Sequence, residues 1–430
     1  MRRTATTRAR TSSPIDERFA HLLARYAQIR NATQALCTDL SAEDCVLQSM
    51  PDASPVKWHL AHTSWFFETF VLEQGLAGYR HFDPSFRFLY NSYYVGVGER
   101  HARPERGLIS RPALDEVYAY RQHVDESIAR WSQTIDPTAQ AVDIFELGLH
   151  HEQQHQELIL TDLKHLLSRN PLGPAYAAAP EVSDDGPCPL RWIAFPPGLR
   201  ETGHAADGFS FDNERPRHRV YLNPFRIASR LVTNREYLAF IDDGGYARPQ
   251  LWLSDGWDTR IAQQWTAPLY WQRDDGGRWR VFTLHGVREL DPDEPVCHVS
   301  CYEADAYARW AGARLATEAE WETAAAGLPV AGNFVESKRF HPATGGSGDG
   351  LRQMYGDVWE WTNSAYLGSP GYRPAAGAVG EYNGKFMVNQ MVLRGGSCAT
   401  PRSHIRATYR NFFYPWARWQ FMGIRLAQDA

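Results

Sequence analysis

The chain has 430 residues, too many for one ordinary hydrophobic core, so we expect two or three domains. Hydrophobic residues make up 43% of the sequence and charged residues 22%, as in ordinary globular proteins. The formal net charge of −5 gives no reason to expect nucleic acid or an anionic membrane as a partner. Because no long apolar run is present, no membrane-spanning helix is predicted either.

The N-terminal segment, residues 1–14, reads MRRTATTRARTSSP and has arginines without an apolar stretch behind them. This pattern argues against a secretory signal peptide, and we expect a disordered tail. The 6 cysteines are scattered and form no C-x-x-C pair, which suits a reducing cytoplasm. Cys297 and Cys301 are four residues apart, and we expect two small buried side chains there.

Four segments in the first part of the chain carry apolar residues at helical spacing. They cover residues 15–36, 54–76, 111–135 and 141–169. Ser54 and Pro55 stand where the N-cap and first residue of the second helix are expected. Four helices with three connections, one of them long, predict a four-helix bundle over residues 15–169.

The composition changes after this bundle. Residues 170–188 are rich in Pro, Ala, Gly and Asp, which predicts a linker. Most of the 15 tryptophans follow it, among many glycines and short apolar runs. Helical patterns are few, chiefly residues 233–244 and 301–327. The sequence therefore predicts an irregular second domain over residues 189–430 and a two-domain α+β fold.

The fourth helical segment contains HHEQQHQELIL, residues 150–160, which includes the motif H-E-x-x-H. His151 and His155 are four residues apart and project from one helix face, so they can bind one metal ion. The second segment adds His59 and His62, and bundles often build metal sites from inward side chains of different helices. The spacing of the residues alone does not show whether His59 or His62 is the third metal ligand. A three-histidine site would leave coordination positions open, as catalysis requires.

The H-E-x-x-H motif is typical of zinc proteases, in which the glutamate is the general base. The longer zincin pattern fails, because Leu158 and Thr161 stand where Gly and His are required. A downstream glutamate ligand would be Glu181, inside the linker, and a zinc hydrolase stays an alternative. We expect Glu152 to lie behind the metal ligands or in solvent. Two more histidines of this helix are expected to face solvent, His150 and His165.

The first half resembles the DinB-like bundle of the EgtB family, the sulfoxide synthases (hercynine oxygenases) of ergothioneine biosynthesis, through HLAHTSWFFETF and HHEQQHQEL. The second half resembles the C-type-lectin-like formylglycine-generating-enzyme (sulfatase-modifying) domain found in the same enzymes. The motifs that carry this second resemblance are FDNERPRHRVYLNPFRI, VTNREYLAFIDDGGY, ARWAGARLATEAEWE, YGDVWEWT and VLRGGSCATPRSHIRATYRNFF. Together the two resemblances cover residues 15–430, and their combination is specific.

The resemblance implies an iron(II) enzyme that uses O₂ as co-substrate. It assigns the iron to His62, His151 and His155, and prefers His62 to His59. An all-histidine ligand set departs from the common pattern of two histidines and one carboxylate. The implied reaction joins a thiol to C2 of the hercynine imidazole and gives a sulfoxide. Small-molecule substrates are therefore the expected partners.

The resemblance also implies substrate-contacting and catalytic residues. It assigns Gln154 to the substrate imidazole, and Asn411 and Phe412 to the trimethylammonium amino acid, which an aromatic face attracts. Tyr93 and Tyr94, in the long connection between the second and third helices, resemble tyrosines that reach the iron site in one branch of the family. The role that we assign to these phenols is proton delivery to a reduced oxygen species.

Two departures from the family bear on the substrate and the activity. Phe413 stands where members that use γ-glutamylcysteine carry an aspartate, which favours free cysteine as the donor. The formylglycine-generating enzymes use a cysteine pair in a region where this chain has only Cys398, so that activity is not expected. The alternatives left open are a selenoneine synthase that uses a selenosugar, an ovothiol-type synthase and a non-catalytic binding protein.

Overall fold

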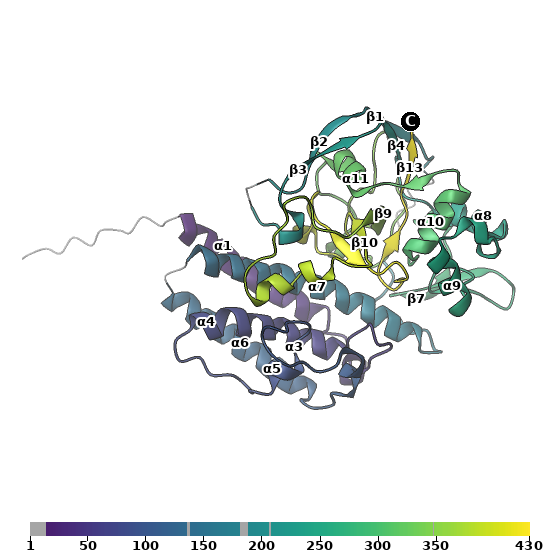
Figure 1. The fold of residues 1–430 in the computed structure, drawn as a ribbon. Coiled ribbons are helices and arrows are strands. Elements are labelled where there is room, and N and C mark those ends of the chain that lie inside the picture. Colours follow the sequence, from purple (N-terminus) through teal and green to yellow (C-terminus); the bar gives the residue numbers. More distant parts are fainter. Residues whose placement is uncertain (1–13, 136–137, 181–187, 206–207, 347) are drawn as a thin grey trace, which may run out of the picture.

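The structure is a computed structural model that describes residues 14–135, 138–180, 188–205, 208–346 and 348–430. A helical domain is followed by a domain that contains small sheets (Figure 1), so the predicted two-domain α+β fold is confirmed. The predicted tail falls on residues 1–13, outside the described residues, except for Pro14, which begins the first helix. The predicted linker is described except for residues 181–187.

Four long helical segments form the N-terminal bundle and lie side by side in Figure 1. They are α1 (Pro14–Ala35), α3 (Val56–Phe67) continued by the π-helical turn η1 (Glu68–Leu72) and α4 (Glu73–Gly75), α6 (Leu114–Thr134) and α7 (Ala139–Ser168). The connections hold the short helices α2 (Ala42–Val46), α5 (Phe86–Leu89) and η2 (Arg103–Leu108). The periodicity of the apolar residues thus located each long helix to within a few residues.

The start of α3 differs from the prediction. Pro55 occupies the N-cap position, Val56 is the first helical residue, and no side chain caps the helix. The backbone N–H of Ser54 instead donates to Asp162 of α7 at 2.8 Å, and its hydroxyl accepts from Arg106 at 2.9 Å. The tertiary contacts of Ser54 have therefore replaced a local cap.

The second domain is built from small sheets. One four-stranded sheet has the order β1 (Trp192–Phe195), β4 (Phe225–Ala228), β13 (Leu426–Asp429) and β8 (Arg314–Leu315). Another has the order β11 (Asn411–Phe413), β10 (Met391–Arg394), β9 (Trp359–Ala365) and β12 (Met422–Gly423). The smaller sheets are β2 (Gly198–Thr202) with β3 (His218–Leu222), and β5 (Trp271–Arg273) with β6 (Trp279–Thr283) and β7 (Gly286–Glu289). The last strand thus pairs with one of the domain's first strands.

The helices of this domain are short. They are α8 (Asn234–Asp242), α9 (Ser254–Ala262), α10 (Cys301–Trp310) and α11 (Glu318–Ala325), with the single turns η3 (Asp212–Glu214), η4 (Gly245–Ala247), η5 (Pro249–Leu251), η6 (Val335–Ser337), η7 (Ala378–Glu381), η8 (Gly384–Phe386) and η9 (Arg402–His404). The helical pattern at residues 301–327 is two helices with β8 between them. Each begins at its own capping box, formed by Ser300 with Glu303 and by Thr317 with Glu320.

The hydrophobic core runs through both domains without a break. Trp65 and Trp131 of the bundle belong to the same buried cluster as Trp321, Trp359 and Trp361 of the second domain. Helix α7 lies at the boundary between them (Figure 1) and is buried along most of its length.

All six cysteines are free and lie among the described residues. Cys297 and Cys301 are buried, as predicted. In the described part of the chain, no helix combines the length and the apolar character that crossing a bilayer needs.

Candidate metal centre

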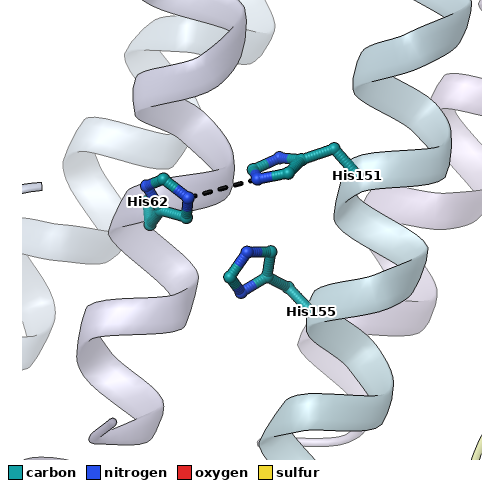
Figure 2. Close-up of side chains that lie close together, drawn as sticks. All are labelled: His62, His151 and His155. Atoms are coloured by element: carbon teal, nitrogen blue, oxygen red, sulfur yellow. Dashed lines mark hydrogen bonds between the residues drawn. The ribbon is translucent and has the colours of Figure 1, made fainter. Parts of the chain in front are cut away.

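Three buried histidines meet where α3 faces α7 inside the bundle. Figure 2 shows His62 of α3 and His151 and His155 of α7 pointing toward one another. One ligand nitrogen from each ring lies within 4.8 Å of the other two. The Nε2 atoms of His62 and His151 are 3.1 Å apart. The three residues predicted to hold a metal are therefore together, and His59 lies outside this group.

Aromatic side chains hold these rings in place. Trp58 and Trp65, one turn before and after His62 on α3, both stack on its imidazole with ring centroids 4.5 and 5.5 Å away. Phe66 stacks on His151 at 4.6 Å. Because these rings are all buried, the histidines have little rotational freedom and little contact with water.

Burial keeps the three imidazoles neutral. It lowers the pKa of His151 to about 3. Burial is also the largest cause for His62 and His155, whose pKa values fall well below the usual range, and the neighbouring histidines lower them further. The neutral imidazole is the form that binds metal ions, so the trio is in its ligand form at neutral pH.

Glu152, the base of the zinc protease hypothesis, is buried between two arginines. Its carboxylate forms ion pairs with Arg30 of α1 and Arg121 of α6, each at 3.0 Å. Burial alone would raise the pKa of Glu152, but the two guanidinium groups outweigh it and lower the pKa to about 2. Of the two places expected for Glu152, the one in solvent is wrong, and the buried side chain is unsuited to accept a proton from water. Glu181, the other residue of that hypothesis, lies outside the described residues.

The two histidines that were expected in solvent are covered. His150 is 3% exposed, its ring stacks on Phe209 at 3.9 Å, and its Nδ1 lies 2.9 Å from Nδ1 of His404. His165 is half-buried, and its Nδ1 lies 2.7 Å from the hydroxyl of Ser49. The expectation was wrong because the second domain and the α2–α3 connection cover faces of α7 that a bundle alone would expose.

Gln154 points from α7 into the second domain. Its amide nitrogen donates to the hydroxyl of Tyr409 at 2.8 Å, and its amide oxygen accepts from the hydroxyl of Tyr382. The ring of Tyr382 also lies 5.8 Å from that of His151. The second domain therefore supplies tyrosines directly beside the histidine trio. Tyr382 was missed in the sequence, because it lies far along the chain in a segment without a recognised motif.

Tyr93 and Tyr94 stack on each other with ring centroids 4.6 Å apart. Tyr94 is fully buried and contacts Phe66, the residue that stacks on His151. Tyr93 lies 6.4 Å from Tyr382, ring to ring. Burial raises the pKa of both phenols, so both carry their proton at neutral pH. The tyrosine pair is thus one aromatic layer away from the trio.

Asn411 and Phe412 begin strand β11. The Phe412 ring stacks on Tyr366 at 4.0 Å and lies 5.9 Å from Phe386, which in turn lies 5.0 Å from Tyr93. The Asn411 side-chain oxygen accepts from the backbone N–H of Phe412 at 2.9 Å. A continuous set of aromatic rings therefore links Phe412 to the tyrosines near the metal centre.

Phe413 takes a different direction from its neighbour. Successive side chains of a strand alternate between its faces, and Phe413 contacts Trp419 with ring centroids 5.9 Å apart. This position is half-buried and aromatic rather than acidic. Phe412 and Phe413 therefore contact different aromatic side chains, although they are neighbours in the sequence.

Arg106 is a further residue that the sequence analysis missed. It is 4% exposed, its guanidinium lies 3.4 Å above the ring of Trp58, and its hydrogen bonds go to the hydroxyls of Ser54 and Ser92. Among the described residues, no carboxylate lies within ion-pair distance of it. Since Trp58 stacks on His62, the Arg106 guanidinium lies two rings away from the trio, and the charge of Asp162 attracts it from beyond ion-pair distance.

A cavity of about 290 Å³ opens on the N-terminal side of the trio. Its lining includes Asp143 and Leu147 of α7 together with Phe211 and Tyr382 of the second domain. Leu147 lies one helical turn before His151 on α7, and Asp143, a further turn before, pairs with Arg18 of α1. Tyr382 separates this cavity from the histidines, which makes the cavity a candidate route to the site.

The chain matches two family models. Residues 25–159 match the DinB superfamily, and residues 187–346 and 336–430 match the Sulfatase-modifying factor enzyme 1-like domain. The second domain is also similar to the formylglycine-generating enzyme of Streptomyces coelicolor, which is 30% identical over 303 residues that cover 60% of this chain and 95% of the relative.

Two relatives are similar over both domains. The hercynine oxygenase of Mycobacterium tuberculosis is 35% identical over 434 aligned residues, which cover 95% of this chain and 98% of the relative. The hercynine oxygenase of Mycolicibacterium thermoresistibile is 33% identical, with 95% of each chain covered. The order of the two domains, the buried histidine trio and this full-length similarity agree. The chain therefore belongs to the hercynine oxygenase family.

Proposed function

We propose that this protein is an iron(II)- and O₂-dependent sulfoxide synthase that joins a thiol to C2 of the hercynine imidazole, a step of ergothioneine biosynthesis. The observation that carries the proposal is the buried, neutral histidine trio next to Gln154 and the tyrosines. Hercynine as the acceptor is supported by the names of the relatives that match the whole chain. The protein is thus proposed to act on small molecules in the cytoplasm.

The donor atoms fit a divalent transition metal. His62 donates from Nδ1 to the backbone oxygen of Tyr90 at 2.6 Å, so its Nε2 carries the lone pair that can bind a metal. The trio contains three neutral nitrogens and no carboxylate, a set that suits Fe(II) as well as Zn(II). Bound Fe(II) would supply the O₂ chemistry that C–S bond formation requires. Metal analysis of the purified protein tests this choice of ion.

Three groups of the chain would orient hercynine. The amide of Gln154 can exchange a tyrosine partner for an imidazole N–H or lone pair. The Phe412 ring, stacked on Tyr366, offers an aromatic face to a quaternary ammonium. Asn411 adds an amide at the same end of the strand. Holding both ends of the substrate would fix the position of C2 and raise the rate by proximity.

Cysteine is the donor that we propose. The buried guanidinium of Arg106 feels the charge of Asp162 but has no carboxylate within ion-pair distance among the described residues. It is therefore a binding partner for the carboxylate of an amino acid, because a buried positive charge is stabilised by an opposite one. Phe413 lacks the negative charge that would bind the amino group of a longer peptide donor. A selenosugar has no carboxylate, so Arg106 favours cysteine over that alternative.

Tyr93 and Tyr94 are proposed as the proton source. Burial raises the pKa of both phenols, so each holds a proton that can be delivered when negative charge develops nearby. Tyr382 contacts the trio more directly than either of them, through His151. Single Tyr→Phe variants at the three positions, assayed for sulfoxide against other oxidised products, distinguish the donors.

The proposal is tested with protein purified without oxygen and loaded with Fe(II). Hercynine and cysteine should then give O₂ consumption and a product with the mass of the sulfoxide. Parallel reactions contain a selenosugar in place of cysteine, or histidine in place of hercynine, to test the selenoneine and ovothiol alternatives. Absence of O₂ uptake with every pair would overturn the synthase, and zinc-supported hydrolysis would revive the hydrolase.

Replacement of a single trio member should remove the activity. We expect His62→Ala to abolish turnover and to lower the bound iron to a small fraction of the wild-type content, because two histidines alone bind a metal weakly. The matched control is His165→Ala, which removes a half-buried histidine outside the trio. Full activity of His62→Ala would show that another residue is the third ligand.

A further inference from the structure

The three histidines of the trio have different partners on their second ring nitrogen. Nδ1 of His62 faces a backbone oxygen, as described above. Nδ1 of His155 lies 2.8 Å from Nδ1 of His59. Nδ1 of His151 is buried without a hydrogen-bond partner among the described residues. Only His155 therefore has a titratable side chain behind it.

His59 connects His155 to a buried carboxylate. Nε2 of His59 lies 3.1 Å from Oδ2 of Asp162, and the same oxygen accepts the backbone N–H of Ser54 at 2.8 Å. His59 is 2% exposed and Asp162 4% exposed. Asp162 follows His155 by seven residues, two helical turns or about 10 Å along α7, so both lie on the same helix face. His59 of α3 fills the gap between them.

The chemistry of these groups gives the chain of hydrogen bonds a direction. Oδ2 of Asp162 already accepts the Ser54 N–H, so it is an acceptor toward His59 as well, and His59 donates to it from Nε2. A neutral imidazole with its proton on Nε2 has its lone pair on Nδ1, so His59 accepts the N–H of His155 there. The proton of His155 is then on Nδ1, and its Nε2 lone pair is directed toward His62 and His151.

We infer that Asp162 and His59 are positioning residues that hold His155 in the tautomer and ring orientation required for metal binding. This inference rests on the proposed function for the identity of the metal site. Among the described residues, no lysine or arginine lies within ion-pair distance of Asp162. Arg106 attracts its charge from beyond that distance. The side-chain hydrogen bond of Asp162 goes to His59, and a chain of hydrogen bonds behind a ligating imidazole fixes its tautomer and ring orientation.

The inferred tautomers can be observed in the metal-free wild-type protein. Nitrogen-15 NMR of histidine-labelled protein distinguishes a ring protonated on Nδ1 from one protonated on Nε2. We expect the Nδ1–H form for His155 and the Nε2–H form for His59. The opposite pair of tautomers, or a mixture in rapid exchange at both rings, would overturn the inference whatever the protein does with metals.

The second measurement is metal affinity, read from the visible absorption of Co(II) and from competition with Fe(II). His59→Phe keeps a ring of similar size without nitrogens, and Asp162→Leu removes the acceptor. Each should weaken Co(II) binding by about 10- to 100-fold. Asp162→Asn, whose amide oxygen can still accept from His59, should recover part of that loss. His165→Phe, on the same helix, is the control and should bind Co(II) like the wild type.

A double variant separates this role from general damage to the fold. If Asp162 acts through His59, Asp162→Leu should weaken Co(II) binding by less than about twofold when His59 is already Phe. Multiplied single effects, or unchanged affinity in both single variants, would overturn the inference. If the wild-type protein binds neither Co(II) nor Fe(II), the proposed function fails instead, and the tautomer measurement still decides the hydrogen-bond direction.

Discussion

Glu152 occupies the position of the catalytic glutamate in a zinc protease motif, but its role in this protein is different. It occupies the second position of H-E-x-x-H, yet its carboxylate lies between Arg30 and Arg121 at the centre of the bundle. Residues at positions i and i+1 of a helix do not face the same way, so the neighbour of a metal ligand is turned toward other helices. Its contribution is to the stability of the bundle.

Replacement of Glu152 by Gln should destabilise the protein by about 3–5 kcal/mol at pH 7, because two buried arginines lose a shared carboxylate. The pKa of Glu152 is about 2 in the folded protein against 4.5 without these contacts. The unfolded state thus binds the proton more readily, and the stabilisation, present above pH 4.5, is lost as the pH falls toward 2. The full loss is about 3 kcal/mol.

Urea unfolding of the wild type and of Glu152→Gln between pH 7 and pH 3 measures how the free energy of unfolding depends on pH. The difference in unfolding free energy between the two proteins should become smaller below pH 4.5. Glu126→Gln, at an exposed position of α6, should change the unfolding free energy by no more than about 0.5 kcal/mol. A gap that stays constant over the whole pH range contradicts the assignment.

The residues of the candidate site differ in how far the sequence could predict them. His151 and His155 follow from helical spacing, because both lie on one helix. The choice of His62 over His59 depended on family resemblance, since the spacing allows either. The partners of Asp162 and Arg106 could not be predicted, because their contacts join α7 and the long connection to α3, and no periodicity encodes contacts between elements.

At the scale of elements, α7 contacts a different part of the protein on each of three faces. One face carries the metal ligands toward α3. A second carries Glu152 and Gln156, which bond to α1 and α6. A third faces the second domain through the residues that bond across the boundary: Gln153, Gln154, Glu157, Thr161 and Lys164. The helix therefore joins the metal site to both domains.

Glu157 of α7 is bound to three donors of the second domain. Its carboxylate accepts from the indole of Trp359 at 2.8 Å and from the hydroxyls of Ser397 and Thr400 at 2.5 and 2.7 Å. Glu157→Leu leaves three buried donors without this acceptor, so we expect a loss of at least about 3 kcal/mol in unfolding free energy. Amide hydrogen exchange should also accelerate at residues 397–404.

Glu157→Gln is the conservative comparison. One carboxylate oxygen accepts from both Trp359 and Ser397, and an amide oxygen can keep those two bonds. We therefore expect the Gln variant to lose less stability than the Leu variant. Equal stability of all three proteins would show that the boundary is held by apolar packing alone.

At the scale of the whole molecule, the domains share one buried cluster of aromatic and aliphatic side chains. We therefore expect one cooperative thermal transition, because neither domain can lose its packing without exposing part of the other. Differential scanning calorimetry measures this, and agreement of the calorimetric and van't Hoff enthalpies is the criterion. Two separated peaks would show that the domains unfold independently.

The overall architecture was predictable only in part. The bundle helices are long and periodic, so their positions follow from the apolar pattern. The sheets of the second domain are short strands paired over long distances, such as Ala427 with Ile227. A strand of two to seven residues has too few positions for its apolar pattern to specify a partner strand two hundred residues away. The irregular α+β character could be predicted, but the strand order could not.

The three faces of α7 also restrict which changes of the chain can be tolerated. A helix turns by about 100° per residue. One residue inserted between His155 and Glu157 would rotate everything after it, so Asp162 would leave His59 and Lys164 would leave the second domain. The interval from His150 to Lys164 should accept substitutions at some positions but no insertion or deletion. The connection between α4 and α6 can vary in length outside its site residues, since it need not keep helical phase.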